Sequence, residues 1–253
     1  MLFELRGVLQ NLLLGIRPLR RRLHRRLGST GMNGDANAAQ ERLDSYLRHL
    51  AIAGKSVLEL GPGHTPEVLL LARSQGASRC VGLDVEHLVE PKGVRERGVE
   101  LDLYDGGRMP YADGTFDVIW SSDVLEHVRD PERTLQECHR VLRPGGMFAA
   151  VIDLRDHYFL HIEQRWLHCL GYSDAMWRAM TSNRSSFVNR ARSSQWRALL
   201  ERAGFELRVY DEQKSELLRR LHQQGRIPVH GRSLTEEDAA TYRLELVAAR
   251  SGA

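Results

Sequence analysis

Apolar residues occur in short uninterrupted blocks between residues 55 and 250, and amphipathic or polar stretches separate these blocks. Each block is long enough for one buried strand and is bounded by turn-forming residues. Strands are therefore expected over 55–60, 80–85, 99–103, 115–122, 147–154, from Gly204 to 211, and over 241–250. Apolar residues at three- and four-residue spacing predict helices over 36–51, 65–76, 131–142 and the first half of 193–211.

Strands that alternate with helices in this way predict an α/β fold with a doubly wound, mostly parallel, seven-stranded sheet. Two helix starts have local support, because Thr65-Pro66 and Asp130-Pro131 each place a capping side chain before a proline at the first helical position. The turn-forming residues 143–146, Arg-Pro-Gly-Gly, are expected to lead into the fifth strand.

The first 27 residues are expected to form a basic amphipathic helix, followed by a glycine-rich linker (28–35) and the main domain (36–253). Its apolar run is too short to span a bilayer, and its positive charge follows the apolar part, unlike that of a secretory signal. Two interpretations stay open: the helix lies on an anionic membrane surface, or it packs on the domain itself or on a second subunit in a homodimer. The apolar face consists of Leu2, Leu5, Leu9, Leu12, Leu13 and Ile16.

The positive charge is concentrated in this N-terminal segment. The 253-residue chain has a formal net charge of +3, whereas residues 1–27 hold seven arginines against one acid, Glu4. The segment therefore carries +6 and the rest of the chain −3, which argues against a nucleic-acid partner. The hydrophobic content of 42% and charged content of 27% are typical of a globular domain.

The three cysteines, Cys80, Cys138 and Cys169, lie far apart and form no C-x-x-C pair. This spacing predicts neither a disulfide framework nor a metal site, and it favours a reducing compartment. We therefore expect the protein in the cytoplasm, peripheral at the inner face of the plasma membrane if its N-terminal helix binds lipid.

Two glycines follow the first strand of the main domain, in the segment Glu59-Leu-Gly-Pro-Gly63. The G-x-G spacing of Gly61 and Gly63 lets backbone approach a ligand closely, but Pro66 stands where a dinucleotide site has its third glycine. The pattern therefore indicates a ligand loop without specifying a dinucleotide.

Acidic residues stand near the ends of three successive predicted strands, at Glu59, Asp84 and Asp102. In a doubly wound sheet these ends meet at one edge, where ligands bind. The Glu59 carboxylate would repel a pyrophosphate but suits a cationic amino acid, whereas Asp84 can accept from ribose hydroxyls and Asp102 from an adenine amino group. A ligand with a sulfonium, an ammonium, a ribose and an adenine but no phosphate fits this set, and that ligand is S-adenosylmethionine.

Five ordered blocks between residues 50 and 155 resemble the class I S-adenosylmethionine-dependent methyltransferases, among them ELGPG, GLDVE and the stretch from Met109 to Gly146. The resemblance implies a Rossmann-like methyltransferase domain over 36–253 that turns S-adenosylmethionine into S-adenosylhomocysteine. By position it implies that Glu59, Gly61 and Gly63 hold the methionine part, Asp84 the ribose, Asp102 and Leu103 the adenine, and Ser121 or Ser122 the floor. Pro62 and Val85 complete the expected cofactor-binding set.

Candidate bases for methyl transfer follow the fourth and fifth strands. His157 is favoured, with Asp153 or Asp156 to orient its ring and stabilise its charged form, and His127 is the second candidate. His161 follows His157 by four residues, so the two would share a helical face. No third ligand is evident, and no metal is expected.

The long segment 155–192 is expected to form a helical lid that contacts the acceptor. Its aromatic residues beside Asn, Arg and His suit a sugar ring, or alternatively form the core of an ordinary helical cap. A looser resemblance, over 151–161 and 182–206, is to bacterial methyltransferases of surface-polysaccharide biosynthesis. It implies O-methylation of a sugar hydroxyl on a glycan or glycosylated acceptor. The alternatives are a small-molecule methyltransferase, for a secondary metabolite or quinone, and a non-catalytic cofactor-binding partner subunit.

Overall fold

The computed structural model describes residues 2–14, 36–64, 66–86, 91–183 and 187–252. The predicted linker, the basic half of the N-terminal segment and the predicted capping residue Thr65 lie outside the described residues.

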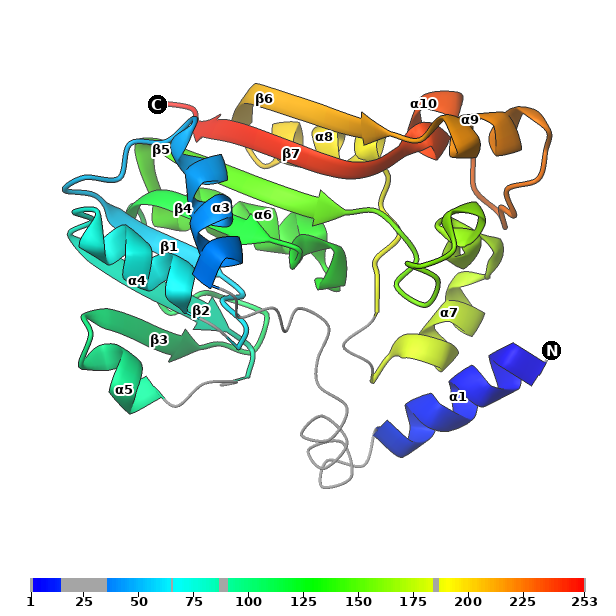
Figure 1. The fold of residues 1–253 in the computed structure, drawn as a ribbon, viewed down its shortest axis with the longest axis horizontal. Helices are drawn as coiled ribbons and strands as arrows, with labels where there is room; N and C mark the ends of the chain where they lie inside the picture. The colour runs from blue at the N-terminus through cyan, green and yellow to red at the C-terminus, as the bar shows by residue number, and fades with distance from the viewer. Residues whose placement is uncertain (1, 15–35, 65, 87–90, 184–186, 253) are drawn as a thin grey trace. The chain divides into compact units, whose positions relative to one another are not determined.

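Seven strands form one mixed sheet in the order β3-β2-β1-β4-β5-β7-β6 (Figure 1). Strand β1 pairs in parallel with β2 and β4, β2 pairs in parallel with β3, and β4 with β5. The arrow of β7 points opposite to those of its neighbours β5 and β6 in Figure 1. The predicted doubly wound, mostly parallel sheet is therefore confirmed. The strands are β1 (Ser56–Leu60), β2 (Arg79–Asp84), β3 (Val99–Leu103), β4 (Phe116–Ser122), β5 (Leu142–Asp153), β6 (Phe205–Lys214) and β7 (Thr241–Arg250).

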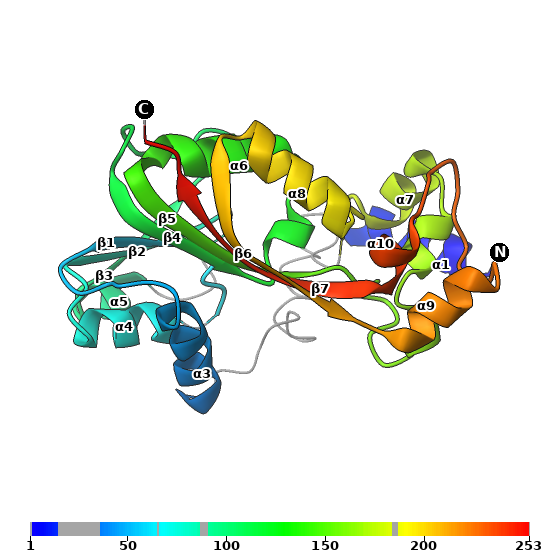
Figure 2. The ribbon, with the colours of Figure 1, turned by 90° about the horizontal axis from the view of Figure 1, so that it is seen from above.

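Helices cover both faces of this sheet. Figure 2 shows α3, α4 and α5 on one side and α6 and α8 on the other, as the alternating pattern predicts. The predicted cap of α6 is confirmed, because Asp130 accepts a hydrogen bond from the Arg133 N–H at 3.0 Å and Pro131 begins the helix. The α-helices are α1 (Leu2–Leu14), α3 (Ala36–Leu47), α4 (Glu67–Ser74), α5 (Pro91–Arg95), α6 (Pro131–Val141), α7 (Asp174–Thr181), α8 (Ser193–Arg202), α9 (Glu216–Gln223) and α10 (Glu236–Ala240), and the 3₁₀ helices are η1 (Leu125–His127), η2 (Glu163–Arg165) and η3 (His168–Gly171).

The predicted start of the fifth strand, at residue 147, is wrong. Strand β5 begins at Leu142, which pairs with Phe116, and the register then shifts so that Met147 pairs with Val118. Residues 143–146 are accommodated between these two pairs, and Gly145 adopts the positive φ of +73°. The turn-forming residues therefore produce a bulge within the strand and do not end it.

The chain divides into two compact units. The sheet unit consists of Gly31–Ile152, Gln195–Asp211 and Leu244–Ala253, and the helical unit consists of Met1–Thr30, Asp153–Ser194 and Glu212–Arg243. The helical unit thus includes the whole predicted lid segment, together with the later helices α9 and α10, which the sequence pattern does not predict. The role of this unit as a lid stays a prediction.

Each unit has its own hydrophobic core. In the sheet unit the Tyr46 ring of α3 stacks on Trp120 of β4, with ring centroids 5.0 Å apart and planes 8° from parallel. In the helical unit Trp177 of α7 is 2% exposed and its indole N–H donates to the Val188 carbonyl at 2.8 Å.

Arg192 joins separate chain segments of the helical unit. Its guanidinium, buried with the rest of the residue, donates to the backbone carbonyls of Leu154 at 2.6 Å and Asp238 at 2.7 Å, and also to that of Thr241. Burial lowers the pKa of Arg192 to about 10. The five-donor guanidinium suits this role because it can satisfy several carbonyls at once.

Candidate functional site

The loop after β1 turns on two glycines that serve different purposes. Gly61 has φ +72°, and a Cβ on it would lie 2.4 Å from Cγ2 of Val124, so the packing of the chain itself requires glycine there. Gly63 has φ +65°, and a Cβ on it would meet nothing within 4 Å. Open space beside backbone of this kind is what a close-fitting ligand needs.

Glu59, near the end of β1, is a buried carboxylate with an unmet hydrogen-bonding atom. The residue is 3% exposed, and its Oε2 accepts no hydrogen bond. Burial raises the pKa of Glu59 to about 7, and the nearby Arg42 guanidinium opposes that shift. Leaving a buried carboxylate unpaired is costly, so this position favours a ligand that carries positive charge or donates hydrogen bonds.

Glu67, at the start of α4, adds a second carboxylate that the sequence reading missed. Its Oε2 is also buried and accepts no hydrogen bond, and its charge helps to raise the pKa of Glu59. An acid in the first turn of a helix is ordinarily explained by the helix dipole, so nothing in the sequence pattern marks Glu67 as a site residue.

The two acids at the ends of β2 and β3 have partners. Asp84 accepts from the Val85 N–H at 2.7 Å and more weakly from the Gly63 N–H at 3.4 Å, and burial raises its pKa. Asp102 accepts from the Tyr111 hydroxyl at 3.0 Å. The weak contact with Gly63 ties the end of β2 to the glycine loop, so these residues lie at one edge of the sheet as predicted from the strand ends.

The remaining expected cofactor residues differ in exposure. Val85 is 62% and Leu103 45% exposed, which is unusual for aliphatic side chains and leaves both free to cover a ring. Pro62, by contrast, is only partly exposed, and its Cγ would lie 2.8 Å from a Cβ added to Gly82 of β2.

Strand β4 brings two serines to the same edge. Ser121 is buried and donates to the Leu60 carbonyl at 3.3 Å, whereas Ser122 donates to the Asp123 carboxylate at 3.2 Å. Asp123 has φ +55°, an uncommon conformation for a residue other than glycine and one that often marks a functional site.

Tyr46 is a further site residue, which the sequence pattern assigned only to the apolar face of its helix. Its hydroxyl is buried and makes no hydrogen bond, and burial, followed by the charge of Glu59, raises its pKa. A buried hydroxyl with no partner beside an unpaired carboxylate is a second group that a ligand could satisfy.

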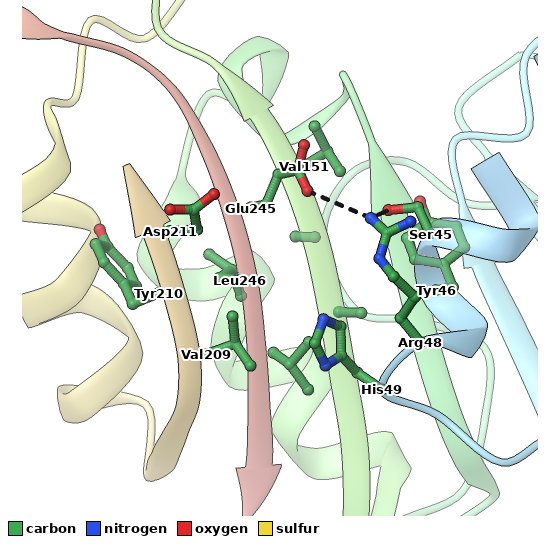
Figure 3. Close-up of a pocket in the computed structure, with 13 residues that line it drawn as sticks. Ser45, Tyr46, Arg48, His49, Val151, Val209, Tyr210, Asp211, Glu245 and Leu246 are labelled. Atoms are coloured by element: carbon green, nitrogen blue, oxygen red, sulfur yellow. Dashed lines mark hydrogen bonds and ion pairs between the residues drawn. The ribbon is translucent and has the colours of Figure 1, made fainter. Parts of the chain in front are cut away.

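A cavity of about 490 Å³ lies on the face of β5, β7 and β6 beside the end of α3 (Figure 3). Arg48 and Glu245 approach to 4.0 Å across it, and Val209 and Leu246 contribute apolar lining. Of the residues discussed for the loop site, only Tyr46 lines this cavity. The cofactor site is therefore identified by the glycine loop and its acids and not by this cavity.

The loop residues fit S-adenosylmethionine. Two buried carboxylate oxygens without partners, Oε2 of Glu59 and of Glu67, suit a ligand with cationic groups and would disfavour a phosphate. Open space beside Gly63 admits the ligand, and Asp84 lies at the adjacent strand end. No conflict with the expected cofactor set appears among these residues.

Among the candidate catalytic residues, Asp153 and His157 lie together within the helical unit. The His157 Nε2 is 3.5 Å from Asp153 Oδ2, and the Arg155 guanidinium donates twice to the same carboxylate, at 2.8 and 2.7 Å. Burial alone would raise the pKa of Asp153, but His157 and Arg155 hold it well below its ordinary value. Asp153 is therefore ionised and can orient the imidazole.

Asp156, the other possible orienting group, differs from Asp153. Its Oδ1 accepts from the Tyr158 N–H at 2.9 Å, its Oδ2 accepts no hydrogen bond, and burial raises its pKa to about 6. The helical face expected for His157 and His161 is not formed, because residues 157–161 lie in turns, and His161 is exposed. His127 ends η1 in the sheet unit and is half-buried.

Several aromatic residues of the segment 155–192 are core residues. Trp177, Phe159 and Phe187 are 2%, 8% and 9% exposed, and none of them presents an open ring face to an acceptor. For these three rings the structure supports the ordinary helical cap and removes the stacking argument for a sugar.

A sheet of this strand order with an acidic glycine loop defines the class I S-adenosylmethionine-dependent methyltransferase fold. A family model described as a methyltransferase domain matches residues 35–209, more than half of the chain. The chain therefore belongs to the methyltransferase-domain family, and S-adenosylmethionine is its cofactor.

Curated relatives carry out methylation on different atoms. The chain is 34% identical over 123 residues to methyltransferase GfsG of Streptomyces halstedii, covering 45% of this chain and 44% of that protein. It is 35% identical over 115 residues to a sarcosine/dimethylglycine N-methyltransferase of Halorhodospira halochloris (43% and 40% covered). It is 31% identical over 111 residues to a ubiquinone biosynthesis O-methyltransferase of Aromatoleum aromaticum (42% and 47% covered). The matches span less than half the length of these relatives.

Among solved structures, an S-adenosylmethionine-dependent methyltransferase from Mesorhizobium loti aligns with a TM-score of 0.55 at 17% identity, covering 85% of this chain and all of that one. At this identity the likeness concerns the fold alone. Within the described residues, none of the helices has the length and apolar character needed to cross a membrane.

Proposed function

We propose that the protein transfers the methyl group of S-adenosylmethionine to a hydroxyl group, and that the acceptor hydroxyl belongs to a sugar of a glycan or glycosylated molecule. The observation that carries the hydroxyl acceptor is the pairing of His157 with the ionised Asp153 at 3.5 Å. A hydroxyl must lose its proton as the new bond forms, and a carboxylate-oriented histidine is suited to accept that proton.

The cofactor supplies a methyl group already activated by the sulfonium. The residues of the chain then bind the cofactor and the acceptor, align the acceptor hydroxyl with the methyl group, exclude water and accept the hydroxyl proton. In this proposal Glu59, Asp84 and Asp102 hold the cofactor, His157 is the general base and Asp153 holds the His157 ring. His127 remains the alternative base, and Asp156 the alternative orienting group.

Two other functions compete with this proposal. A small-molecule acceptor such as a quinone is supported by the relative named as a ubiquinone biosynthesis O-methyltransferase and by the burial of aromatic rings that would otherwise favour a sugar. A non-catalytic subunit that only binds the cofactor would keep the acids of the loop site but would have no need of the His157–Asp153 pair, and that pair disfavours it.

The test is a transfer assay with methyl-labelled S-adenosylmethionine and two fractions of the source organism, the cell envelope and the soluble small molecules. Label in a lipid-extractable or polysaccharide fraction supports the sugar acceptor. Label only among small molecules replaces it with the second candidate. Tight cofactor binding with no label in either fraction contradicts the transfer reaction for both acceptor classes.

A further inference from the structure

Helix α1 packs on α7, and its Phe3 ring also contacts the rings of Tyr158 and Phe159 in the same unit. Gly7 and Asn11 of α1 are buried, and a Cβ added to Gly7 would lie 3.0 Å from the Met180 Cε. The two helices lie side by side within the helical unit (Figures 1 and 2). A glycine at the contact lets the two helix backbones approach closely.

The side chain of Asn11 fixes this orientation. Its amide N–H groups donate to the Ala179 carbonyl at 2.9 Å and the Ser182 hydroxyl at 2.8 Å, and its Oδ1 accepts from the Asn183 N–H at 2.7 Å. The Asn183 side chain in turn donates to the Asn11 carbonyl at 3.1 Å. Because these bonds satisfy backbone groups at the end of α7, a rotation of α1 about its axis would leave several of them unmet.

With this orientation the leucine face of α1 points away from the unit. Leu5, Leu9, Leu12 and Leu13 are 62%, 61%, 64% and 44% exposed. Their spacing of four, three and one residues places them on one side of the helix, opposite Gly7 and Asn11. A contiguous exposed leucine surface of this kind marks an interaction site.

We propose that this face of α1, defined by Leu5, Leu9, Leu12 and Leu13, binds an anionic membrane surface with the helix lying in the plane of the interface. By sequence, residues 1–27 carry seven arginines and one acid, so the leucines belong to a strongly positive segment. An anionic bilayer offers both an apolar layer for leucine and negative head groups for arginine. At 13 residues α1 is about 20 Å long, which is too short to span a bilayer but suitable for lying on one.

The charge argues against a second copy of this chain as the occupant. By sequence, each copy would add a segment of +6 to a dimer formed through this face, and the added positive charge would oppose association. An anionic surface has the complementary charge, and it is the occupant that the observations favour.

The test is sedimentation of the full-length protein with vesicles of phosphatidylcholine, with and without about one third phosphatidylglycerol. The wild type should bind the anionic vesicles, and raising the salt from about 0.1 to about 0.5 M should weaken that binding. The double variant Leu9→Ser/Leu12→Ser should bind these vesicles at least roughly tenfold more weakly than the wild type. Both residues are exposed, so its melting temperature should match that of the wild type.

The matched control is Val229→Ser, which removes an apolar residue that is 37% exposed in the same unit but outside α1. This control should bind vesicles as the wild type does. Equal binding by the double variant and the wild type, or no binding by either, overturns the proposal. A concentration-dependent dimer that the double variant loses, without vesicle binding, assigns the face to a second copy. All of these readouts are independent of methyl transfer.

Discussion

In the sheet unit Glu59 is 3% exposed and one of its carboxylate oxygens accepts no hydrogen bond, whereas in the helical unit Arg192 is 5% exposed and its guanidinium donates to three backbone carbonyl groups. Both residues bury an ionisable group. Burial raises the pKa of Glu59 to about 7, so this side chain is partly protonated at physiological pH. Burial lowers the pKa of Arg192 to about 10, so this side chain stays charged.

The difference separates two uses of a buried charge. Arg192 donates to three carbonyl groups of the chain, so its buried charge contributes to the stability of the fold. One carboxylate oxygen of Glu59 has no hydrogen-bond donor in the chain, so its burial costs stability until a cationic or hydrogen-bonding ligand binds. An unmet buried group is therefore a better indicator of a binding site than burial or charge alone.

The largest effect is expected on turnover, from a change at His157, the proposed base in the helical unit. Replacing His157→Asn should lower turnover by a factor on the order of 10² to 10⁴, because it removes the proposed base. Cofactor affinity, measured by calorimetry, should stay nearly unchanged. Unchanged turnover removes His157 from the mechanism and returns the candidacy to His127.

The structural use of charge is tested by Arg192→Leu. The substitution leaves three buried carbonyl groups without their donor, so the free energy of unfolding should fall by about 3–5 kcal/mol in a denaturant titration. The control Arg202→Leu removes a surface ion pair with Glu132 at 3.2 Å and should cost less than about 1 kcal/mol. Similar losses in the two variants would mean that the buried bonds of Arg192 carry no special weight.

Glu59→Gln, unlike Arg192→Leu, is expected to raise the free energy of unfolding. Folding raises the pKa of Glu59 from its ordinary 4.5 to about 7, so the folded state binds the proton more tightly and the stability of the cofactor-free protein falls as pH rises from 4.5 to 7. At pH 8 the variant should be more stable than the wild type by up to about 3 kcal/mol, and the gain should vanish below pH 4.5.

The same variant should bind S-adenosylmethionine roughly 10- to 100-fold more weakly, because a charged hydrogen bond is lost. Melting curves at several pH values, with and without cofactor, separate the two effects. A variant that loses stability at pH 8 would show that the chain itself satisfies Glu59, and the comparison with Arg192 would fail.

The smallest effect on stability is expected at the second glycine of the loop. Gly63→Ala meets no neighbouring atom, so only its positive φ of +65° should cost stability, about 1 kcal/mol. Gly61→Ala would place its Cβ against Val124 and should cost more. If the cofactor occupies the open space beside Gly63, Gly63→Ala should weaken cofactor binding by more than its loss of stability explains. A binding titration measures the affinity, and the melting temperature measures the loss of stability.

Much of the sheet unit could be predicted from the sequence because its signals are local. Strands β3 and β7 have the predicted bounds, and β1, β2 and β4 agree within one residue at each end. Apolar blocks between turn residues identify such strands without reference to the rest of the chain. The acids near the strand ends could be predicted for the same reason, because parallel topology brings those ends together.

The helical unit could not be predicted in this way because it depends on contacts between distant segments. Nothing in the sequence of α9 or α10 indicates that they pack with the segment after β5, and the aromatic residues Trp177 and Phe187 look the same in sequence whether they form a core or a binding surface. Glu67 and Tyr46 were missed because each has an ordinary role in its own helix. Only the structure shows that the Glu67 Oε2 and the Tyr46 hydroxyl are buried without hydrogen-bond partners.

The interleaving of the helical unit also determines the order in which the chain can fold during synthesis. Helix α1 precedes α7, to which Asn11 donates a hydrogen bond, by five strands in the chain, and one carbonyl acceptor of Arg192, that of Thr241, lies later still. The sheet can begin to pair while the leucines of α1 still lack the support of α7. The growing chain therefore exposes the leucines of α1 before α7 can orient the helix, and during that interval they are accessible to a membrane or a chaperone.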